Sequence, residues 1–387
     1  TVDTEIQKAC GKLLNDRAGS ISVMDIYTGD IIAMYSSPSY DPNKFLFGIS
    51  NDDWALIRNN PLKPLINKTL SGLYSPGSTI KPIVALSALE NKIVSPNFKV
   101  KCTGKMELYG QTFHCWKEKG HGFMSLKNAM KQSCDTYFYE VARLLGVDRL
   151  NVTAEKFGLG KKVLGDYYDY EKSGLFPNTK WKKNNLGKGW VLGETLITGI
   201  GQGYTQTTPL QLCLMTAQIA NGGYSIKPRI VVNNNPMSLE EAKSKLQEET
   251  LHGQEKKLFK DHKNIKIVQE AMFSSTNELY GTSYKSRIDN PKYQFAGKTG
   301  TAQVKRISMR ERELDLKIEQ IPYKDRDHAL FVAYGPYVNP RYALSIIVEH
   351  GGSGSRTAAP IAKELFKLII DRDKLRNKQK NFEEIDI

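Results

Sequence analysis

The stretch "SISVMDIYTGDIIAMYSS", residues 20–37, contains two apolar segments separated by a tight turn. Residues 20–26 and 31–37 have the apolar composition of strands, and the glycine of the intervening "YTGD" is typical of a turn. We therefore predict two strands joined by a tight turn near the N-terminus. This pair decides the fold, because the next strand patterns appear only in the last third of the chain.

Strand patterns return near the C-terminus, and helical patterns occupy most of the chain between. The predicted strands of the last third are residues 293–304, 329–335 and 342–350. The segments with helical spacing of apolar residues are 1–16, 78–93, 125–146, 208–223 and 357–372. One antiparallel sheet built from both chain ends, with a helical region inserted, explains this order better than two sequential domains. It gives an α+β architecture.

The composition of the 387 residues is that of a globular protein, with 40% hydrophobic and 25% charged residues. The formal charge of +14 suits an anionic partner. However, the basic residues are scattered, and no zinc finger, RNP-type motif or basic helix is recognisable, so we expect no nucleic-acid partner. No run of about 18 apolar residues is present to span a membrane. Residues 304–328 are charge-dense and predict an exposed loop or short helical flap.

The first of three short motifs, "YSPGSTIKP", contains Ser78 and Lys81, which are three residues apart and would share one face of a helix. A partly buried lysine with a lowered pKa can remove the proton that makes a serine hydroxyl a poor nucleophile. The helix N-terminus would stabilise negative charge near Ser78. Alone, this pattern is also typical of a helix start with an exposed lysine.

The second motif is Ser133-Cys134-Asp135. Ser133 can shuttle a proton between Lys81 and a leaving group, and Asp135 can fix the lysines or the substrate. By itself the motif is equally typical of a polar helix turn.

The third motif, "AGKTGTAQ", lies on a predicted strand. Its Lys298, Thr299 and Thr301 form a cluster suited to a carboxylate, and Gly300 lets a substrate backbone approach the strand edge closely. The alternative is an ordinary edge strand that contains a glycine.

The order and spacing of these motifs resemble the S-x-x-K, S-x-N/D and K-T-G set of the penicillin-recognising serine enzymes. The intervals are 133 − 78 = 55 and 298 − 133 = 165 residues. The segments "SCDTYFYEVARLLG", "GIGQGYTQTTPLQ" and "HALFVAYGPYVNPRYALSIIVEHGG" are similar to the transpeptidase domain of class B penicillin-binding proteins. Asp135 and the "KGHG" segment resemble the elongation type, penicillin-binding protein 2. The resemblance implies the transpeptidase fold shared with β-lactamases.

The activity that this resemblance implies is that of a peptidoglycan D,D-transpeptidase. Ser78 would attack the penultimate D-alanine carbonyl of a stem peptide, with Lys81 as base, and an amine of a neighbouring strand would resolve the acyl-enzyme. Ser133 and Lys298 would pass the proton to the departing D-alanine. β-Lactams would mimic D-alanyl-D-alanine and acylate Ser78.

Substrate binding is implied in the same way. The backbone N–H groups of Ser78 and Thr301 would form the oxyanion hole. Lys298, Thr299 and Thr301 would hold the terminal carboxylate beside Gly300. A serine β-lactamase, a D,D-carboxypeptidase and a β-lactam sensor share these motifs, and the lifetime of the acyl-enzyme separates a lactamase from a penicillin target. A scaffold that only binds peptidoglycan is less consistent with three intact motifs.

The resemblance covers nearly the whole chain. It implies a transpeptidase domain at residues 1–372, with a helical subdomain at roughly 78–230, and a charged C-terminal extension at 373–387. Such proteins carry an N-terminal transmembrane helix and a pedestal domain, and neither is recognisable here, so we expect a fragment of a longer protein. The implied location is the periplasm, on a protein anchored in the inner membrane of a bacterium. The implied partners are a membrane glycosyltransferase and an elongation scaffold protein.

Five cysteines are present, and an odd number cannot all pair within one chain. Cys10 and Cys213 lie on the apolar faces of predicted helices, which indicates buried filler. Cys102, Cys115 and Cys134 lie between Lys81 and the end of the second motif, so these three are candidate metal ligands.

With His121, these three cysteines would form a Cys₃His set, a common closed zinc site. The intervals of 13, 6 and 13 residues do not match a zinc ribbon. From spacing alone, a Cys102–Cys115 disulfide and the replacement of one ligand by His114 stay open.

The family resemblance favours the metal. Elongation-type relatives can bind zinc here through acidic residues, the histidine of "GHG" and the cysteine of the second motif. His121 and Cys134 match, whereas Cys102 and Cys115 stand in place of expected aspartates and are softer ligands. We expect a structural zinc, because four protein ligands leave no position for water.

Overall fold

The structure of the chain is a computed structural model, and it describes residues 1–165, 168–231, 238–251, 257–305 and 318–383. Its largest sheet has five strands, all antiparallel to their neighbours. Their order is β2 (Ile31–Ser37), β1 (Gly19–Asp25), β9 (Tyr342–Val348), β8 (His328–Gly335) and β7 (Ala296–Ala302). β1 pairs with β9 in a register that sets Val23 opposite Leu344. This confirms the predicted sheet built from both chain ends.

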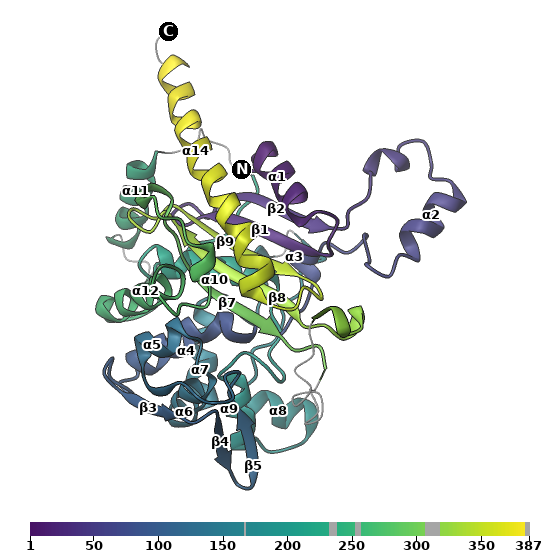
Figure 1. Cartoon of the computed structure of the whole chain (residues 1–387). Helices are drawn as coiled ribbons and strands as arrows, with labels where there is room; N and C mark the ends of the chain where they lie inside the picture. The colour runs from purple at the N-terminus through teal and green to yellow at the C-terminus, as the bar shows by residue number, and fades with distance from the viewer. Residues whose placement is uncertain (166–167, 232–237, 252–256, 306–317, 384–387) are drawn as a thin grey trace.

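Each face of this sheet has its own core. Ile21 and Val23 of β1 pack in a cluster with residues of α1 (Thr4–Leu14) and α14 (Ala359–Glu383), which lie on one face (Figure 1). On the opposite face, α10 (Pro209–Ala220) lies against β1, β8 and β9 and is buried along its whole length. Successive strand side chains point to opposite faces, so one strand serves both cores.

Many of the remaining helices lie together below the sheet in Figure 1. Before the first motif lie η1 (Pro42–Phe45), α2 (Asn51–Arg58) and α3 (Lys68–Ser71). The inserted region contains η2 (Gly77–Ile80), α4 (Lys81–Glu90), α5 (Leu126–Lys131), α6 (Asp135–Leu145), α7 (Val147–Lys156), α8 (Thr179–Leu186) and α9 (Leu192–Thr198). After α10 come α11 (Leu239–Leu251), α12 (His262–Asn277), η4 (Tyr284–Ser286), η5 (Pro291–Tyr293), η6 (Ile318–Gln320), η7 (Tyr323–Asp325) and η8 (Gly354–Ala358).

Two small sheets inside the helical region differ from the sequence analysis, which expected mostly helix there. β3 (Lys99–Cys102) pairs with β6 (Gly122–Ser125), and β4 (Lys105–Leu108) pairs with β5 (Gln111–His114). Each strand has four residues, too few for a clear alternation, and most of their side chains are not buried. Cys102 is the last residue of β3, and Cys115 directly follows β5.

The structure describes only part of the two charged segments, residues 304–328 and 373–387. α14 continues to Glu383 through most of the predicted C-terminal extension. The predicted 304–328 loop has η6 and η7 in its described part, while residues 306–317 lie outside the described residues.

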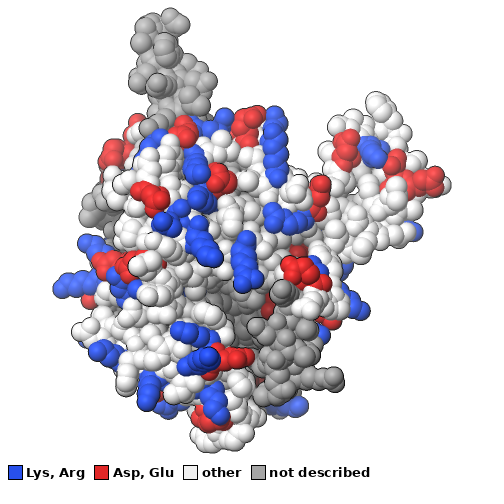
Figure 2. Space-filling view, viewed as in Figure 1, with Lys and Arg blue, Asp and Glu red and all other residues white. Residues whose placement is uncertain are grey.

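Charge is distributed over the surface as the sequence suggests. Figure 2 shows Lys and Arg side chains spread across the visible face, with Asp and Glu side chains between them. Among the helices that the structure describes, none combines the length and apolarity needed to cross a membrane.

Candidate active site and metal cluster

Ser78 of the first motif lies in the 3₁₀ turn η2, which runs directly into α4. The preceding Gly77 has φ +53°, and a Cβ there would lie 2.5 Å from the Thr301 carbonyl oxygen, so only glycine fits. This close approach brings the start of the first motif against the end of the third. The prediction that Ser78 opens a helix is therefore confirmed in outline, with a 3₁₀ turn as the first turn.

Lys81 is fully buried, and its amine contacts the second motif. Nζ donates to Asp135 Oδ1 at 2.8 Å and to the Ser133 carbonyl at 2.9 Å, and lies 3.2 Å from Ser133 Oγ. Among the described residues, Lys81 makes no hydrogen bond with Ser78 Oγ, although both belong to one motif. Lys81 thus pairs with Asp135 and not with Ser78, the partner that the sequence spacing suggested.

The second motif breaks a helix that the sequence pattern predicted as continuous. α5 ends at Lys131 and α6 begins at Asp135, and between them Ser133 has φ +54°. A left-handed serine is uncommon, and here it directs both the carbonyl and the hydroxyl of Ser133 to Lys81. The helical prediction for residues 125–146 was wrong at this turn, because nothing in the local sequence marks the break.

Lys298 approaches Ser133 from the opposite side, on β7. Its buried Nζ donates to Ser133 Oγ at 2.8 Å and to the Thr299 carbonyl at 3.1 Å. Burial lowers the pKa of Lys298 well below its ordinary value, and the nearby charge of Lys81 lowers it further, while Asp135 opposes the shift. Ser133 Oγ thus lies within hydrogen-bond distance of both lysine amines.

The other residues of the third motif divide into two environments. Thr299 is largely buried, and its hydroxyl donates to Thr282 at 2.9 Å, while Thr301 is exposed. The structure gives a further reason for a glycine at position 300. A Cβ there would lie 2.7 Å from Thr79 Cγ2 and 3.0 Å from the Pro76 carbonyl oxygen. The glycine admits the protein's own first motif, which packs directly on the strand.

Two residues at the site make contacts that the sequence did not predict. The Trp116 amide donates to Asp135 Oδ2 at 2.9 Å, and its indole N–H lies 3.1 Å from the carbonyls of Gln132 and Ser133. The side-chain amide of Gln202 donates to the Thr301 carbonyl at 3.1 Å. Trp116 directly follows Cys115, and this adjacency to a candidate ligand was the available signal.

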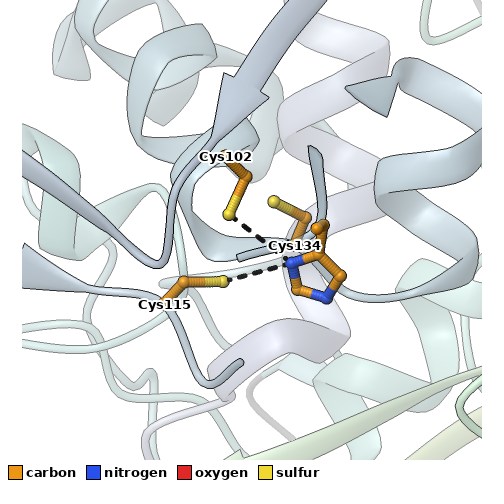
Figure 3. Close-up of side chains that lie close together, drawn as sticks. Cys102, Cys115 and Cys134 are labelled. Atoms are coloured by element: carbon orange, nitrogen blue, oxygen red, sulfur yellow. Dashed lines mark hydrogen bonds between the residues drawn. The ribbon is translucent and has the colours of Figure 1, made fainter. Parts of the chain in front are cut away.

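The four candidate metal ligands come together as predicted. Atoms offered by Cys102, Cys115, His121 and Cys134 all lie within 4.8 Å of one another. His121 Nδ1 lies 3.5 Å from the sulfur of Cys102 and 3.6 Å from that of Cys115, and Figure 3 shows the three sulfurs facing one imidazole. All five cysteines are free thiols, so the Cys102–Cys115 disulfide is absent from this structure.

The sulfurs and the imidazole shift one another's pKa values. The hydrogen bond between Cys134 and Cys115 lowers the pKa of Cys115 to about 2 and raises that of Cys134, because one proton is shared between two sulfurs. Burial opposes the ionisation of Cys102, yet hydrogen bonds with Thr136 and His121 lower its pKa. Burial also opposes protonation of His121, but its sulfur neighbours raise its pKa. The cluster therefore favours the thiolate, the form that binds metal, at Cys102 and Cys115.

Cys10 and Cys213 are also fully buried, as predicted for filler. Burial raises the pKa of Cys10 to about 12 and also raises that of Cys213. Both therefore stay neutral thiols, in contrast to Cys102 and Cys115 of the cluster, whose pKa values are lowered.

Three features together define the class of penicillin-recognising serine enzymes. A buried lysine directly follows a 3₁₀ turn that contains a serine. A second serine lies between two lysine amines, and an edge strand carries the lysine-threonine-glycine sequence. The chain belongs to the penicillin binding protein transpeptidase domain family, whose profile matches residues 19–367.

Curated relatives support this membership. The peptidoglycan D,D-transpeptidase MrdA of Salmonella typhimurium strain LT2 is 35% identical over 374 residues, which cover 96% of this chain and 58% of the relative. The protein of the same name from Escherichia coli K12 is 34% identical over 374 residues, covering 96% and 56%. The chain thus spans somewhat more than half the length of these relatives.

Solved structures show the same fold. Pseudomonas aeruginosa PBP2 in complex with WCK 5153 matches with a TM-score of 0.79 and 38% identity, over 94% of this chain and 73% of that one. PBP2 in a complex with MreC, from Helicobacter pylori, matches with a TM-score of 0.80 and 31% identity, over 95% and 63%.

Proposed function

We propose that this chain is the catalytic part of a peptidoglycan D,D-transpeptidase of the PBP2 type and a covalent target of β-lactams. The observation that carries the proposal is the buried hydrogen-bonded row Lys81–Ser133–Lys298, whose first member follows Ser78 by three residues in the first motif. Such a row can move a proton between a nucleophile and a leaving group without the participation of bulk water.

In the first half-reaction, Ser78 Oγ attacks the carbonyl carbon of the penultimate D-alanine, and the hydroxyl proton passes to Lys81. The amide C–N bond then breaks, and Ser133 with Lys298 delivers a proton to the departing D-alanine nitrogen. An ester on Ser78 remains. In the second half-reaction, an acceptor amine attacks this ester, forms the new amide and returns the proton to Ser78.

The ion pair with Asp135 supports a specific order of events at Lys81. Lys81 Nζ lies 2.8 Å from the Asp135 carboxylate, and the amine can act as a base only after it gives up a proton. Ser133 Oγ lies within hydrogen-bond distance of both amines and offers a route for that proton toward Lys298, where burial favours the neutral amine with its free lone pair. Lys298, Thr299 and Thr301 then hold the terminal carboxylate of the substrate, with Gly300 at the strand edge.

The test is mass spectrometry of the intact protein after incubation with benzylpenicillin. We expect a stable adduct of one penicillin on the wild type and none on Ser78→Ala. Persistent labelling of Ser78→Ala, or rapid turnover of the adduct by the wild type, would refute the transpeptidase assignment and in the second case favour a β-lactamase.

We further propose that Cys102, Cys115, His121 and Cys134 hold a structural zinc ion. The donor set fits, since three sulfurs and one imidazole nitrogen within 4.8 Å are the ligands of a closed tetrahedral site. When bound, the ion would supply cross-linking of β3, β5 and the second motif rather than chemistry on the substrate. Metal analysis of protein purified without chelator tests this, and a zinc content near zero would contradict it.

The relatives also support a proposal for the location and the partners of this protein. A PBP2 relative is described in a complex with MreC, and another match concerns a peptidoglycan synthase complex. We propose the same setting here, namely the periplasmic face of a bacterial inner membrane with a glycosyltransferase and a scaffold protein as partners. Co-purification of a longer form with these two partners tests it, and failure of both to bind would count against it.

A further inference from the structure

The loop between α12 and β7 contains a threonine that contacts both the third motif and the end of α5, just before the second motif. The backbone N–H of Thr282 donates to the carbonyl of Lys131 at 3.1 Å, two residues before Ser133. The Thr282 hydroxyl accepts from Thr299 at 2.9 Å and lies 3.2 Å from the hydroxyl of Ser275 on α12. Thr282 lies outside all three motifs, yet it connects the third motif to the helix that leads into the second.

Ser275, Thr282 and Thr299 form a row of hydroxyls that begins on α12 at Ser275 and ends at Thr299 on the edge strand β7. Ser275 is fully buried, Thr282 is half-buried, and Thr299 is 8% exposed. Each hydroxyl has one hydrogen to donate and can also accept, so all members of a row can donate in the same direction. Aligned donors polarise one another, which strengthens the bond made by the last member.

The row has a fixed frame, because the loop is held at several other points. Glu278 forms ion pairs with Lys127 at 2.7 Å and with Lys131 at 3.1 Å. The Ser283 hydroxyl pairs with Thr276 at 3.2 Å and donates to the Ser275 carbonyl at 3.1 Å. The oxygen of Thr282 is therefore a fixed point against which Thr299 is oriented.

We propose that Ser275 and Thr282 are positioning residues that aim the Thr299 hydroxyl at a ligand carboxylate. This inference rests on the proposed function, in which Thr299 binds that carboxylate. In this structure Thr299 donates to Thr282. On binding, Thr299 donates outward to the anion, Thr282 donates to Thr299, and Ser275 donates to Thr282. Only O–H bonds rotate, so no proton changes its oxygen.

The reversal predicts selectivity for a free carboxylate over its ester. A negatively charged acceptor forms a stronger hydrogen bond than a neutral one, so it gains most from a polarised donor. Thr282→Val keeps the backbone N–H and nearly the same volume but removes the hydroxyl. The probes are benzylpenicillin and benzylpenicillin methyl ester, which differ in that charge and in one methyl group.

The experiment measures the second-order rate constant of Ser78 acylation by each probe in stopped flow. For Thr282→Val we expect a loss of about tenfold with the acid and of less than about twofold with the ester. Thr282→Ser should restore the acid rate to within about twofold, and Ser275→Ala should lower it about threefold. The matched control is Thr276→Val, which removes a hydroxyl of the neighbouring pair and should change neither rate.

An equal loss with acid and ester, or an unchanged acid rate in Thr282→Val, overturns the inference. If Thr282→Val does not melt as a folded protein, the acid-to-ester ratio of Ser275→Ala decides the question by the same criterion. Failure of the proposed function is seen separately, because the wild type would then not be acylated at Ser78 by benzylpenicillin. A wild type that reacts normally, with variants that lack acid selectivity, refutes only the positioning role.

Discussion

The two walls of the active site hold their lysines in opposite ways. On the helical wall, formed by η2, α4 and the turn 132–135, Lys81 is neutralised by Asp135 at 2.8 Å. On the sheet wall, formed by β7, Lys298 is just as buried but donates to Ser133 Oγ and a backbone carbonyl, and no carboxylate of the described residues is among its hydrogen-bond partners. The first lysine is stabilised as a cation and the second is not.

The walls also differ in what keeps them in place. β7 is held by a backbone ladder to β8 that continues through the sheet. The turn 132–135 lies outside the strand ladders, and the backbone amides of residues 132–134 donate to carbonyls of the preceding α5. Side chains fix it to other elements, since the Trp116 indole donates to its carbonyls and the Asp135 amide donates to the Cys115 sulfur at 3.3 Å. Side-chain substitutions should therefore act mainly on the helical wall, whereas pH should act on the sheet wall.

The largest effect is expected from breaking the ion pair of the helical wall. Asp135→Ala leaves the fully buried Lys81 without its counter-charge, and losing one partner of a buried pair costs about 3–5 kcal/mol. Urea unfolding measures this free energy. The control is Glu278→Ala, whose ion pairs with Lys127 and Lys131 are partly exposed to water and whose loss should cost about 1 kcal/mol. Equal losses in the two variants would mean that the buried pair has no special role.

The next largest effect is expected from removing the metal of the cysteine cluster, which supports the same helical wall. Zinc present at about a hundred times its Kd adds about 2.7 kcal/mol to the free energy of unfolding, so chelation should lower the melting temperature and slow acylation. Cys134→Ala should abolish zinc binding and the chelator effect, whereas Cys10→Ala, an equally buried cysteine outside the cluster, should retain both. A melting curve of the wild type that does not respond to chelator would contradict a structural metal.

The difference between the walls also explains what the sequence could predict. Residues 20–37 and the C-terminal strands predicted the sheet correctly, because alternation and turn residues are local signals. The motif set predicted which residues gather at the site. In contrast, the left-handed Ser133 and the α5–α6 break depend on contacts from Trp116 and Lys81, which are distant in sequence.

The metal cluster lies between these cases. Spacing alone left zinc and a disulfide open, and only the family resemblance favoured the metal. The four-residue strands β3 and β5 that deliver Cys102 and Cys115 carry too little pattern to be predicted. Thr282 was missed for a related reason, since a single threonine in a loop has no signal until the fold brings it beside Thr299.

The sheet wall should respond to pH through Lys298. Because burial lowers its folded-state pKa, the unfolded chain binds a proton there that the folded chain does not, so this residue makes stability rise as pH rises toward 10.5, the ordinary value for lysine. Lys298→Met removes the contribution. Its advantage in free energy of unfolding over the wild type should shrink between about pH 7 and pH 10, by at most about 1.4 kcal/mol per pH unit. A difference that is constant with pH in urea titrations would show that Lys298 is charged in the folded state.

The smallest effect tests whether the helical wall is held by Trp116 itself or only by the cluster beside it. Trp116→Phe keeps an aromatic ring next to His121 but removes the indole N–H shared by the Gln132 and Ser133 carbonyls, which should cost about 1 kcal/mol. Trp190→Phe removes an indole hydrogen bond to Thr195 that does not touch the motifs, so it serves as the control. If Trp116 holds the turn, its variant should acylate several-fold more slowly with zinc content unchanged, while the control loses comparable stability at an unchanged rate. If both variants acylate like the wild type, the cluster and the Lys81–Asp135 pair suffice to hold Ser133, and the two walls differ in charge alone.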